Sequence, residues 1–257
     1  MRDLPLFEDD RAEPGVIEAT MLHRHAPVLA DVAVLCFFSD VLEDLAARGE
    51  LVERYRLRSE MGLNPIYELT TSAGSVSVVH PGVGAPLAAG FAEEMIGLGA
   101  RTLVAVGGAG ALIEGLSLGH PMVVSSALRD EGTSFHYAAP SRVIEADPLG
   151  VAVAAAALGE AGLDYLVGRT WTTDGFLRET RSRIQRRVDE DCVMVDMESA
   201  AFIAVARYRD VRFAQILYAG DSLAGETWDS RHWVHAGDVR ERLLRVAVRA
   251  ALRLASA

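Results

Sequence analysis

The sequence predicts one α/β domain in which helices cover both faces of a central sheet. Short, uninterrupted apolar runs rich in β-branched residues alternate with longer helical patterns, and strands of this composition are typically buried on both faces. Glycine and proline are spread along the chain, without a linker, repeat or low-complexity stretch to mark a domain boundary. A chain of 257 residues is long enough to bury such a sheet, so we expect a single domain over 1–257.

Apolar runs define the predicted strands, and proline and glycine define the ends of the helices between them. The strands are expected at 32–38, 76–80, 101–106, 121–127, 164–171, 193–195 and 211–219. The helices are expected at 41–48, 86–96, 148–161, 199–208 and 238–254, the last of them amphipathic. Pro86 and Pro148 suit the first turn of a helix, whereas Gly49, Gly97 and Gly162 suit its C-terminal end. This order predicts a sheet built largely from βα units.

The charge balance and the cysteines limit the classes of partner and compartment. Lys and Arg number 25 against 36 Asp and Glu, a net charge of −11, and such a surface repels nucleic-acid phosphates and anionic lipid. We therefore expect no nucleic-acid and no membrane partner, and the apolar runs are too short to cross a bilayer. The acidic residues 1–14 lack the apolar region of a signal peptide. Cys36 and Cys192 lie in apolar runs without a C-x-x-C spacing, which favours reduced thiols in a cytoplasmic protein.

Glycines and acidic residues follow the predicted strands. Gly82-Val-Gly84 follows the strand at 76–80, and a glycine-rich segment at 107–110 follows the strand at 101–106. Asp196-Met-Glu198 and Gly220-Asp221 follow two later strands. In sheets of this kind, ligands bind outside the carboxyl ends of the strands. We therefore expect these four segments to form one site, with the 107–110 segment as a loop that offers backbone N–H groups at a helix N-terminus.

In their order and separations, these segments resemble the nucleoside phosphorylase family, which includes hexameric purine nucleoside phosphorylase, uridine phosphorylase and related nucleosidases. The most specific match is Val195-Asp-Met-Glu-Ser-Ala-Ala201, and the likeness runs from about residue 30 to the C-terminus. The resemblance implies a mixed, twisted sheet that partly closes into a barrel. Residues 1–25 precede the match as an N-terminal extension for which no structure is predicted.

The resemblance assigns nucleoside contacts to four residues. Met197 would pack under the ribose, and Glu198 would accept hydrogen bonds from its hydroxyls, a role that suits a carboxylate. Phe176 and Val195 would contact the base. From the residues alone two other interpretations stay open, because an acidic residue at a helix start complements the helix dipole and a Phe after a strand is commonly part of the core.

Asp221 is implied to be the general acid of a purine-cleaving enzyme. When the glycosidic bond breaks, electrons flow into the base, and a protonated Asp beside N7 can donate a proton to it. Arg231 is implied to assist this acid, and Arg240 is a rival for that role. The alternative is that Asp221 only caps the turn at 220–225.

The phosphate site departs from the family pattern. The resemblance places phosphate or water at Gly84, Gly107 and Gly108, with Arg58 reaching a neighbouring subunit. However, residues 37–43 replace the family's Gly-Asp-Pro-x-x-Arg loop and bring in Asp40, and Ala105 stands where the family has a strand-end Arg. Binding a dianion normally requires arginines or several backbone N–H groups.

Three functions therefore compete. The first is phosphorolysis of a purine nucleoside, with inorganic phosphate as co-substrate and no cofactor. The second is hydrolysis, with Asp40 or Glu43 near the attacking water, and the third is non-catalytic nucleoside binding. No cluster of His, Cys and Asp has the spacing of a metal site. Because the family completes each site with a neighbour, here through Arg58 and either His23 or His25, we expect a homo-oligomer, a dimer or a trimer of dimers.

Overall fold

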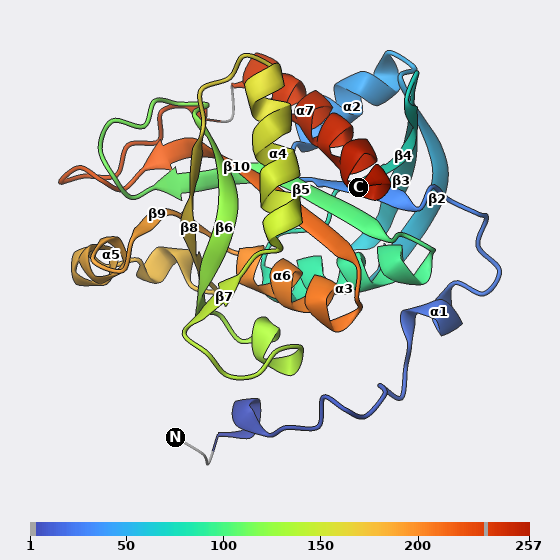
Figure 1. Cartoon of the computed structure of the whole chain (residues 1–257), viewed down its shortest axis with the longest axis horizontal. Helices are drawn as coiled ribbons and strands as arrows, with labels where there is room; N and C mark the ends of the chain where they lie inside the picture. The colour runs from blue at the N-terminus through green and yellow to red at the C-terminus, as the bar shows by residue number, and fades with distance from the viewer. Residues whose placement is uncertain (1–3, 234–235) are drawn as a thin grey trace.

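The computed structural model describes residues 4–233 and 236–257 (Figure 1). The strands are β1 Val32–Cys36, β2 Leu51–Ser59, β3 Gly62–Thr71, β4 Gly74–Val79, β5 Thr102–Ala111, β6 Pro121–Asp130, β7 Val143–Glu145, β8 Leu166–Thr173, β9 Cys192–Asp196 and β10 Arg212–Ser222. The α-helices are α1 Ala19–Leu22, α2 Ser39–Ala47, α3 Ala85–Gly97, α4 Pro148–Glu160, α5 Arg181–Val188, α6 Ser199–Tyr208 and α7 Gly237–Ser256. Short 3₁₀ turns lie at η1 Pro5–Phe7, η2 Thr133–His136 and η3 Phe176–Arg178.

All the strands belong to one mixed sheet, part of which closes on itself. The strand order is β10-β6-β8-β9-β5-β1-β4-β3-β2, with β7 beside β6. Because β10 also pairs with β5, the strands β10, β6, β8, β9 and β5 form a closed barrel, and the remaining strands extend from it. The predicted single α/β domain with a partly barrel-like sheet is confirmed.

Helices cover both faces of the sheet. Helices α3 and α6 pack together on one face, and α4 and α7 pack together on the other (Figure 1). Each layer buries its own apolar cluster against the strands, as the uninterrupted apolar runs predicted. Within the described residues, no helix has both the length and the apolarity needed to cross a bilayer.

Strand β5 is longer than predicted and lies at the centre of the sheet. The predicted loop at 107–110 is wrong, because β5 continues through these residues and pairs with β10 and β9. Their lack of side chains explains this: a Cβ on Gly107 would lie 2.9 Å from the Phe37 ring, and one on Gly110 would lie 2.5 Å from Leu223. The glycines here allow side chains to pack directly on a strand, and no helix N-terminus follows them.

The sequence analysis missed the β2–β3 hairpin and helix α5. Along β2 only Leu51 and Leu57 are buried, because the hairpin lies at the edge of the sheet. It therefore has no continuous apolar run to find. Helix α5 is rich in arginine and buries only Ile184 and Arg187 among its residues. Elements with little apolar surface give a weak periodic signal.

The N-terminal extension packs on the folded domain. Ala19 lies so close to Gly97 that a Cβ on that glycine would be 2.7 Å away. The Glu18 carboxylate pairs with Arg209 at 2.9 Å, and Phe7 meets the Phe135 ring at a centroid distance of 5.4 Å. The described part of the extension thus follows the outer side of α3 and α6, while residues 1–3 lie outside the described residues.

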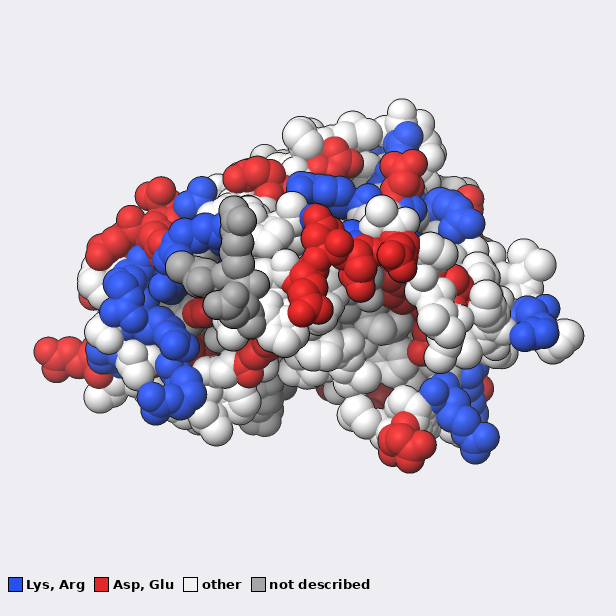
Figure 2. All heavy atoms as spheres, turned by 90° about the horizontal axis from the view of Figure 1, so that it is seen from below, with Lys and Arg blue, Asp and Glu red and all other residues white. Residues whose placement is uncertain are grey.

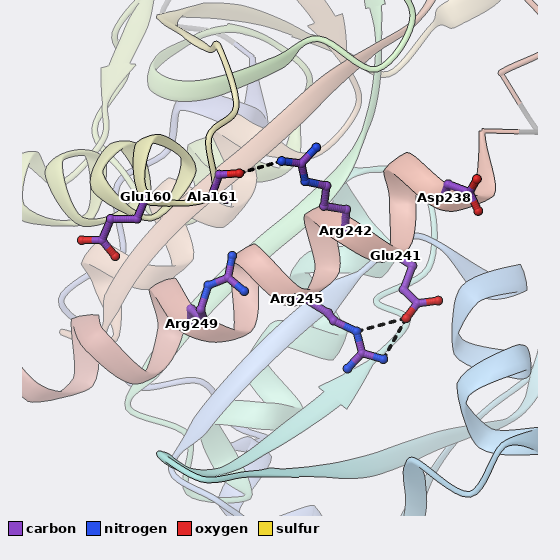
Figure 3. A pocket seen from close by; sticks show the side chains of 7 residues that line it. All are labelled: Glu160, Ala161, Asp238, Glu241, Arg242, Arg245 and Arg249. Carbon is purple, nitrogen blue, oxygen red and sulfur yellow. Dashed lines mark hydrogen bonds and ion pairs between the residues drawn. The ribbon is translucent and has the colours of Figure 1, made fainter.

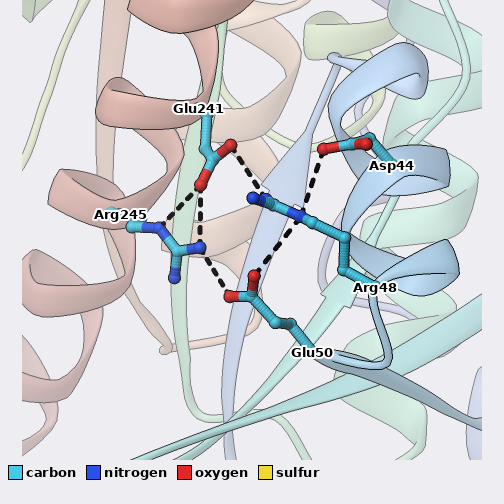
Figure 4. A network of polar contacts seen from close by, with 5 residues as sticks. All are labelled: Asp44, Arg48, Glu50, Glu241 and Arg245. Carbon is cyan, nitrogen blue, oxygen red and sulfur yellow. Dashed lines mark hydrogen bonds and ion pairs between the residues drawn. The ribbon is translucent and has the colours of Figure 1, made fainter.

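A network of ion pairs joins α2 and β2 to α7 (Figure 4). Arg48 donates to Glu241 at 2.9 Å, and Arg245 donates to Glu50 at 2.6 Å and to Glu241 at 2.8 Å. These side chains are partly exposed, so each pair contributes at most about 1 kcal/mol. Together they hold the N-terminal half of α7 beside α2, and Arg240 lies in the first turn of this helix, next to Glu241.

Candidate active site

The carboxyl ends of the parallel strands β1, β4, β5 and β10 meet on one side of the sheet. The segments that follow them, together with the β9–α6 turn, bring several of the predicted site residues into one region. The clearest evidence is the hydrogen bond between Gly84 and Glu198, which are 114 residues apart. The expectation that these segments lie together is therefore confirmed, whereas the role of each residue stays a prediction.

Glu198 is buried and attached to the glycine segment. Its Oε1 accepts a hydrogen bond from the Gly84 N–H at 2.6 Å, and its Oε2 accepts from the Met197 N–H at 3.3 Å. Gly84 has a φ of +91°, a conformation that glycine adopts without a steric penalty. Burial, followed by the charge of Asp196, raises the pKa of Glu198 to about 8. The empty site therefore holds a proton on Glu198 at neutral pH, and hydroxyl donors of a bound ribose would favour its ionised form.

Asp196 fixes the turn that carries Met197 and Glu198. It accepts hydrogen bonds from the Thr170 and Thr172 hydroxyls, both at 3.0 Å, and from the backbone N–H groups of Glu198 and Ser199 at 2.9 and 2.6 Å. Glu198 makes no side-chain cap bond at the start of α6, so Asp196 satisfies the donors there instead. The sequence analysis gave Asp196 no role, although an Asp just before a helix is a signal for capping.

The base-side residues gather around the end of β5. A Cβ on Gly110 would lie 2.5 Å from Leu223, 2.9 Å from Val195 and 3.5 Å from Asp221 Oδ1. Asp221 Oδ2 accepts a hydrogen bond from the Trp228 Nε1–H at 2.6 Å. The Asp221 side chain thus bonds to an indole rather than to a backbone N–H of 220–225, which is not the contact that a turn cap would make.

A second carboxyl lies near Asp221. Glu179 ends the η3 turn, which begins at Phe176, and Phe176 is 58% exposed. Burial, followed by the charge of Asp221, raises the pKa of Glu179 to about 7. Glu179 therefore retains its proton close to neutral pH. Sequence reasoning missed Glu179, because nothing in the local pattern distinguishes it from an exposed helix-flanking acid.

The predicted partnership of Asp221 with an arginine is not present in the structure. Arg231 donates from Nη1 to the Leu116 carbonyl at 2.7 Å, and its Nε lies 3.8 Å from Asp229. Arg240 instead pairs with Asp40 at 2.9 Å. Each guanidinium therefore bonds to acceptors other than the Asp221 carboxylate.

The predicted phosphate region is lined with aromatic rings. Gly108 is exposed although its neighbours in β5 are buried, so the strand is open to the cleft at this point. Tyr218 pairs with Gly108 across the β5–β10 ladder, and its hydroxyl would lie 3.4 Å from a Gly108 Cβ. The Phe38 ring packs edge-on against Tyr218. Arg58 lies on the outer strand β2 of its own chain. That it contributes to the phosphate site of a neighbouring subunit stays a prediction.

Two histidines form contacts that the sequence did not predict. His80 Nδ1 accepts from the Gly82 N–H at 3.1 Å, and burial lowers the pKa of this ring, which keeps it neutral. His80 thereby helps to hold the glycine segment at the end of β4. His23 bonds to Glu94 at 3.0 Å with a side chain only 7% exposed, whereas His25 is exposed. His23 is therefore engaged within its own chain.

A separate groove of about 790 Å³ runs between the end of α4 and α7 (Figure 3). Several of its lining side chains already have partners: Arg245 pairs with Glu241, and Arg242 donates to the Ala161 carbonyl at 2.6 Å. None of the predicted site residues lines it. On the face in Figure 2, basic side chains gather toward the left and acidic side chains form separate groups, so charge is patchy there despite the net −11.

The structure is an α/β fold with a closed barrel, and glycine-rich and acidic segments lie at the carboxyl ends of its strands. Residues 31–256 match the family model described as the phosphorylase superfamily, and the chain belongs to that family. Guanosine phosphorylase of Halorubrum lacusprofundi is 28% identical over 223 residues, 84% of this chain and 89% of the relative. The DeoD-type purine nucleoside phosphorylase of Exiguobacterium sibiricum is 27% identical over 216 residues, 82% of this chain and 85% of the relative. The chain is thus an enzyme of the nucleoside phosphorylase type.

Solved structures show the same fold. Uridine phosphorylase from Vibrio fischeri superposes with a TM-score of 0.72 at 20% identity, over 89% of this chain and 93% of that one. Purine nucleoside phosphorylase from Toxoplasma gondii, in complex with immucillin-H, superposes with a TM-score of 0.74 at 18% identity, over 88% and 92%. At these identities the likeness concerns the fold alone.

Proposed function

We propose that this enzyme cleaves the N-glycosidic bond of a purine nucleoside by phosphorolysis, releasing the free base and ribose 1-phosphate. The observation that carries the proposal is the buried Glu198, which bonds to Gly84 and is held by Asp196. Val195, at the end of the same strand, lies with Asp221 around Gly110. A buried carboxyl at this place suits a ligand with paired hydroxyl donors, as a ribose has. No further cofactor is proposed.

The chemistry follows from the placement of the carboxyls. A phosphate oxygen attacks C1′, the bond from C1′ to the base nitrogen breaks, and its electron pair passes into the base. Asp221, whose charge reaches the nearby Glu179, donates a proton to N7 of the departing purine. Leu223 and Val195 supply an apolar wall for the base, which excludes water from this side of the cleft.

The proposal of a purine rests on two supports. An Asp at the end of β10 suits protonation of a purine, and relatives that match more than four fifths of the chain are named guanosine and purine nucleoside phosphorylases. By contrast, uridine phosphorylase of Thermococcus kodakarensis is 36% identical over only 39% of this chain and 36% of its own. The free, buried thiols of Cys36 and Cys192 support a cytoplasmic location.

The test is to incubate the full-length enzyme with inosine, guanosine, adenosine or uridine, with and without inorganic phosphate, and to quantify the released base and sugar phosphate. We expect phosphate-dependent release from the purine nucleosides. Equal release without phosphate would identify a hydrolase, which the missing arginine at Ala105 and the exposed Asp40 favour as the second candidate. If no nucleoside releases its base, the remaining function is nucleoside binding without catalysis.

A homo-oligomer is part of the proposal. Several large apolar side chains are exposed in the single chain, including Val16 and Val28, both 96% exposed, and Met61, 79% exposed. Surfaces of this kind are typical of contacts between subunits. Light scattering at micromolar concentration should detect a dimer or a larger assembly.

A further inference from the structure

Arg240 is a buried arginine whose hydrogen-bonding capacity is largely unused. Its side chain is 7% exposed, and Nη1 donates to Asp40 Oδ2 at 2.9 Å. Its Nε is buried and has no partner among the residues that the structure describes. A guanidinium stays charged in proteins and carries five N–H donors, so one carboxylate leaves most of them unsatisfied. Burying such a group with unsatisfied donors costs free energy in the empty protein, and an anion that reached these donors would offset that cost.

The guanidinium lies beside the segment 37–43, which stands where the family has its phosphate-binding loop. Its carbon sits 4.9 Å from the centre of the Phe38 ring, a cation–π contact that holds the head group beside the end of β1. Phe38 in turn packs edge-on against Tyr218, with ring centroids 5.7 Å apart. Tyr218 lies against Gly108, the exposed position of β5. Arg240 and Gly108 thus border the same pair of aromatic rings.

Apart from Arg58 on β2, the segments predicted to bind phosphate contain no arginine of their own, and Arg240 is a cation that lies beside one of them. Ala105 and the segment 37–43 contain no arginine, so neither β5 nor the β1–α2 connection can supply a guanidinium to an anion. Arg240 comes from the last helix, yet its head group lies beside that same connection. Planar guanidinium groups bind phosphate oxygens through two parallel hydrogen bonds, which a single contact to Asp40 does not use.

We propose that Arg240 binds the phosphate co-substrate and that Asp40 occupies its guanidinium only while the site is empty. Asp40 lies in the first turn of α2 with its side chain 45% exposed, so it can turn into solvent when an anion arrives. The ion pair then neutralises Arg240 in the free enzyme, and phosphate competes with Asp40 for the same donors. This inference rests on the proposed phosphorolysis.

The competition makes two substitutions act in opposite directions. Asp40→Asn removes the competing charge and should lower the KM for phosphate about threefold to tenfold, whereas Arg240→Gln should raise it about tenfold to a hundredfold. The KM for inosine should change less than about twofold in both, because neither side chain contacts the nucleoside half. A purely structural ion pair would instead make both variants lose stability without separating the two KM values.

The experiment measures initial rates with inosine and inorganic phosphate varied independently, on the full-length enzyme. Glu50→Gln and Arg245→Gln are the matched controls, because they break another ion pair of α7 outside the cleft. Arg240→Lys covers the case in which Arg240→Gln does not fold, and it should raise the phosphate KM while keeping the charge. Phosphate KM values equal to wild type in Asp40→Asn and Arg240→Lys would overturn the proposal.

Thermal unfolding with added inorganic phosphate separates this inference from the proposed function. Phosphate should raise the Tm of Asp40→Asn more than that of wild type, and should leave Arg240→Lys less stabilised. If wild type releases base equally without phosphate, phosphorolysis fails, and these Tm shifts still decide whether Arg240 binds the anion. Equal shifts in all three proteins would refute the assignment of Arg240.

Discussion

The two halves of the cleft are built in different ways. In the half proposed to bind the nucleoside, Asp196 accepts four hydrogen bonds, and Glu198 joins the β9–α6 turn to Gly84. In the half proposed to bind phosphate, the Arg240 guanidinium packs over Phe38, which contacts Tyr218, and has one carboxylate partner. A satisfied polar network is rigid and specific, whereas an unsatisfied cation favours a ligand. The comparison suggests that the first half is preformed and the second changes when its anion binds.

The largest expected effect concerns the acid in the nucleoside half. Asp221→Asn should lower kcat about 10²- to 10⁴-fold for inosine, because the departing base then receives no proton from this position. Asn can still accept from Trp228, so the Tm should stay near that of wild type. Steady-state kinetics with a nucleoside whose base leaves without protonation should show a smaller loss. Asp229→Asn, on the exposed side of the same loop, is the control.

Asp196→Asn tests whether the nucleoside half is a preformed network. In an Asn side chain only the oxygen accepts hydrogen bonds. The N–H or hydroxyl groups that bonded to the other oxygen of Asp196 would then face the amide NH2 group, which is itself a donor. We expect unfolding in urea to show a loss of about 2–4 kcal/mol. Asp40→Asn, in the other half, should cost less, since Asp40 is partly exposed. Similar losses in both variants would remove the contrast between the halves.

The protonation of Glu198 predicts how stability depends on pH. Its pKa is about 8 in the folded protein against an ordinary 4.5, so the folded state binds more protons than the unfolded state between these values. The stabilisation is therefore complete below about pH 4.5 and is lost as the pH rises toward 8. Urea unfolding across this range should show a steeper decline for wild type than for Glu198→Gln. Parallel curves would mean that Glu198 is ionised in the empty site.

The smallest expected effect belongs to Glu179. Its pKa of about 7 means that it loses its proton as the pH passes neutrality, which places a negative charge near Asp221. We expect kcat/KM for inosine to fall above about pH 7. Glu179→Gln should shift the pH at which this decline occurs and change the rate at the optimum less than about tenfold. Glu226→Gln, an exposed acid on the neighbouring loop, should keep the wild-type profile.

Much of the site could be located from the sequence because its residues follow strands. Apolar runs and helix ends reveal the strand–helix order, and the carboxyl ends of such strands form the site. The glycines at 107–110 misled this reasoning, since glycine indicates a turn locally but here makes room for Phe37 and Leu223 against a continuous strand. Arg240 was considered only as a partner of Asp221, because the sequence does not reveal which acid a distant arginine meets.

The sequence by itself determined the class of fold, the helix ends and the acidic and glycine-rich segments that line the cleft, since each of these depends on residues close together in the chain. The tertiary structure decided the closure of the barrel through β10 and β5, the contact of Glu198 with Gly84, and the pairing of Arg240 with Asp40. The last two join residues 114 and 200 positions apart. Local periodicity carries no information about such contacts, because they form only when packing brings distant elements together.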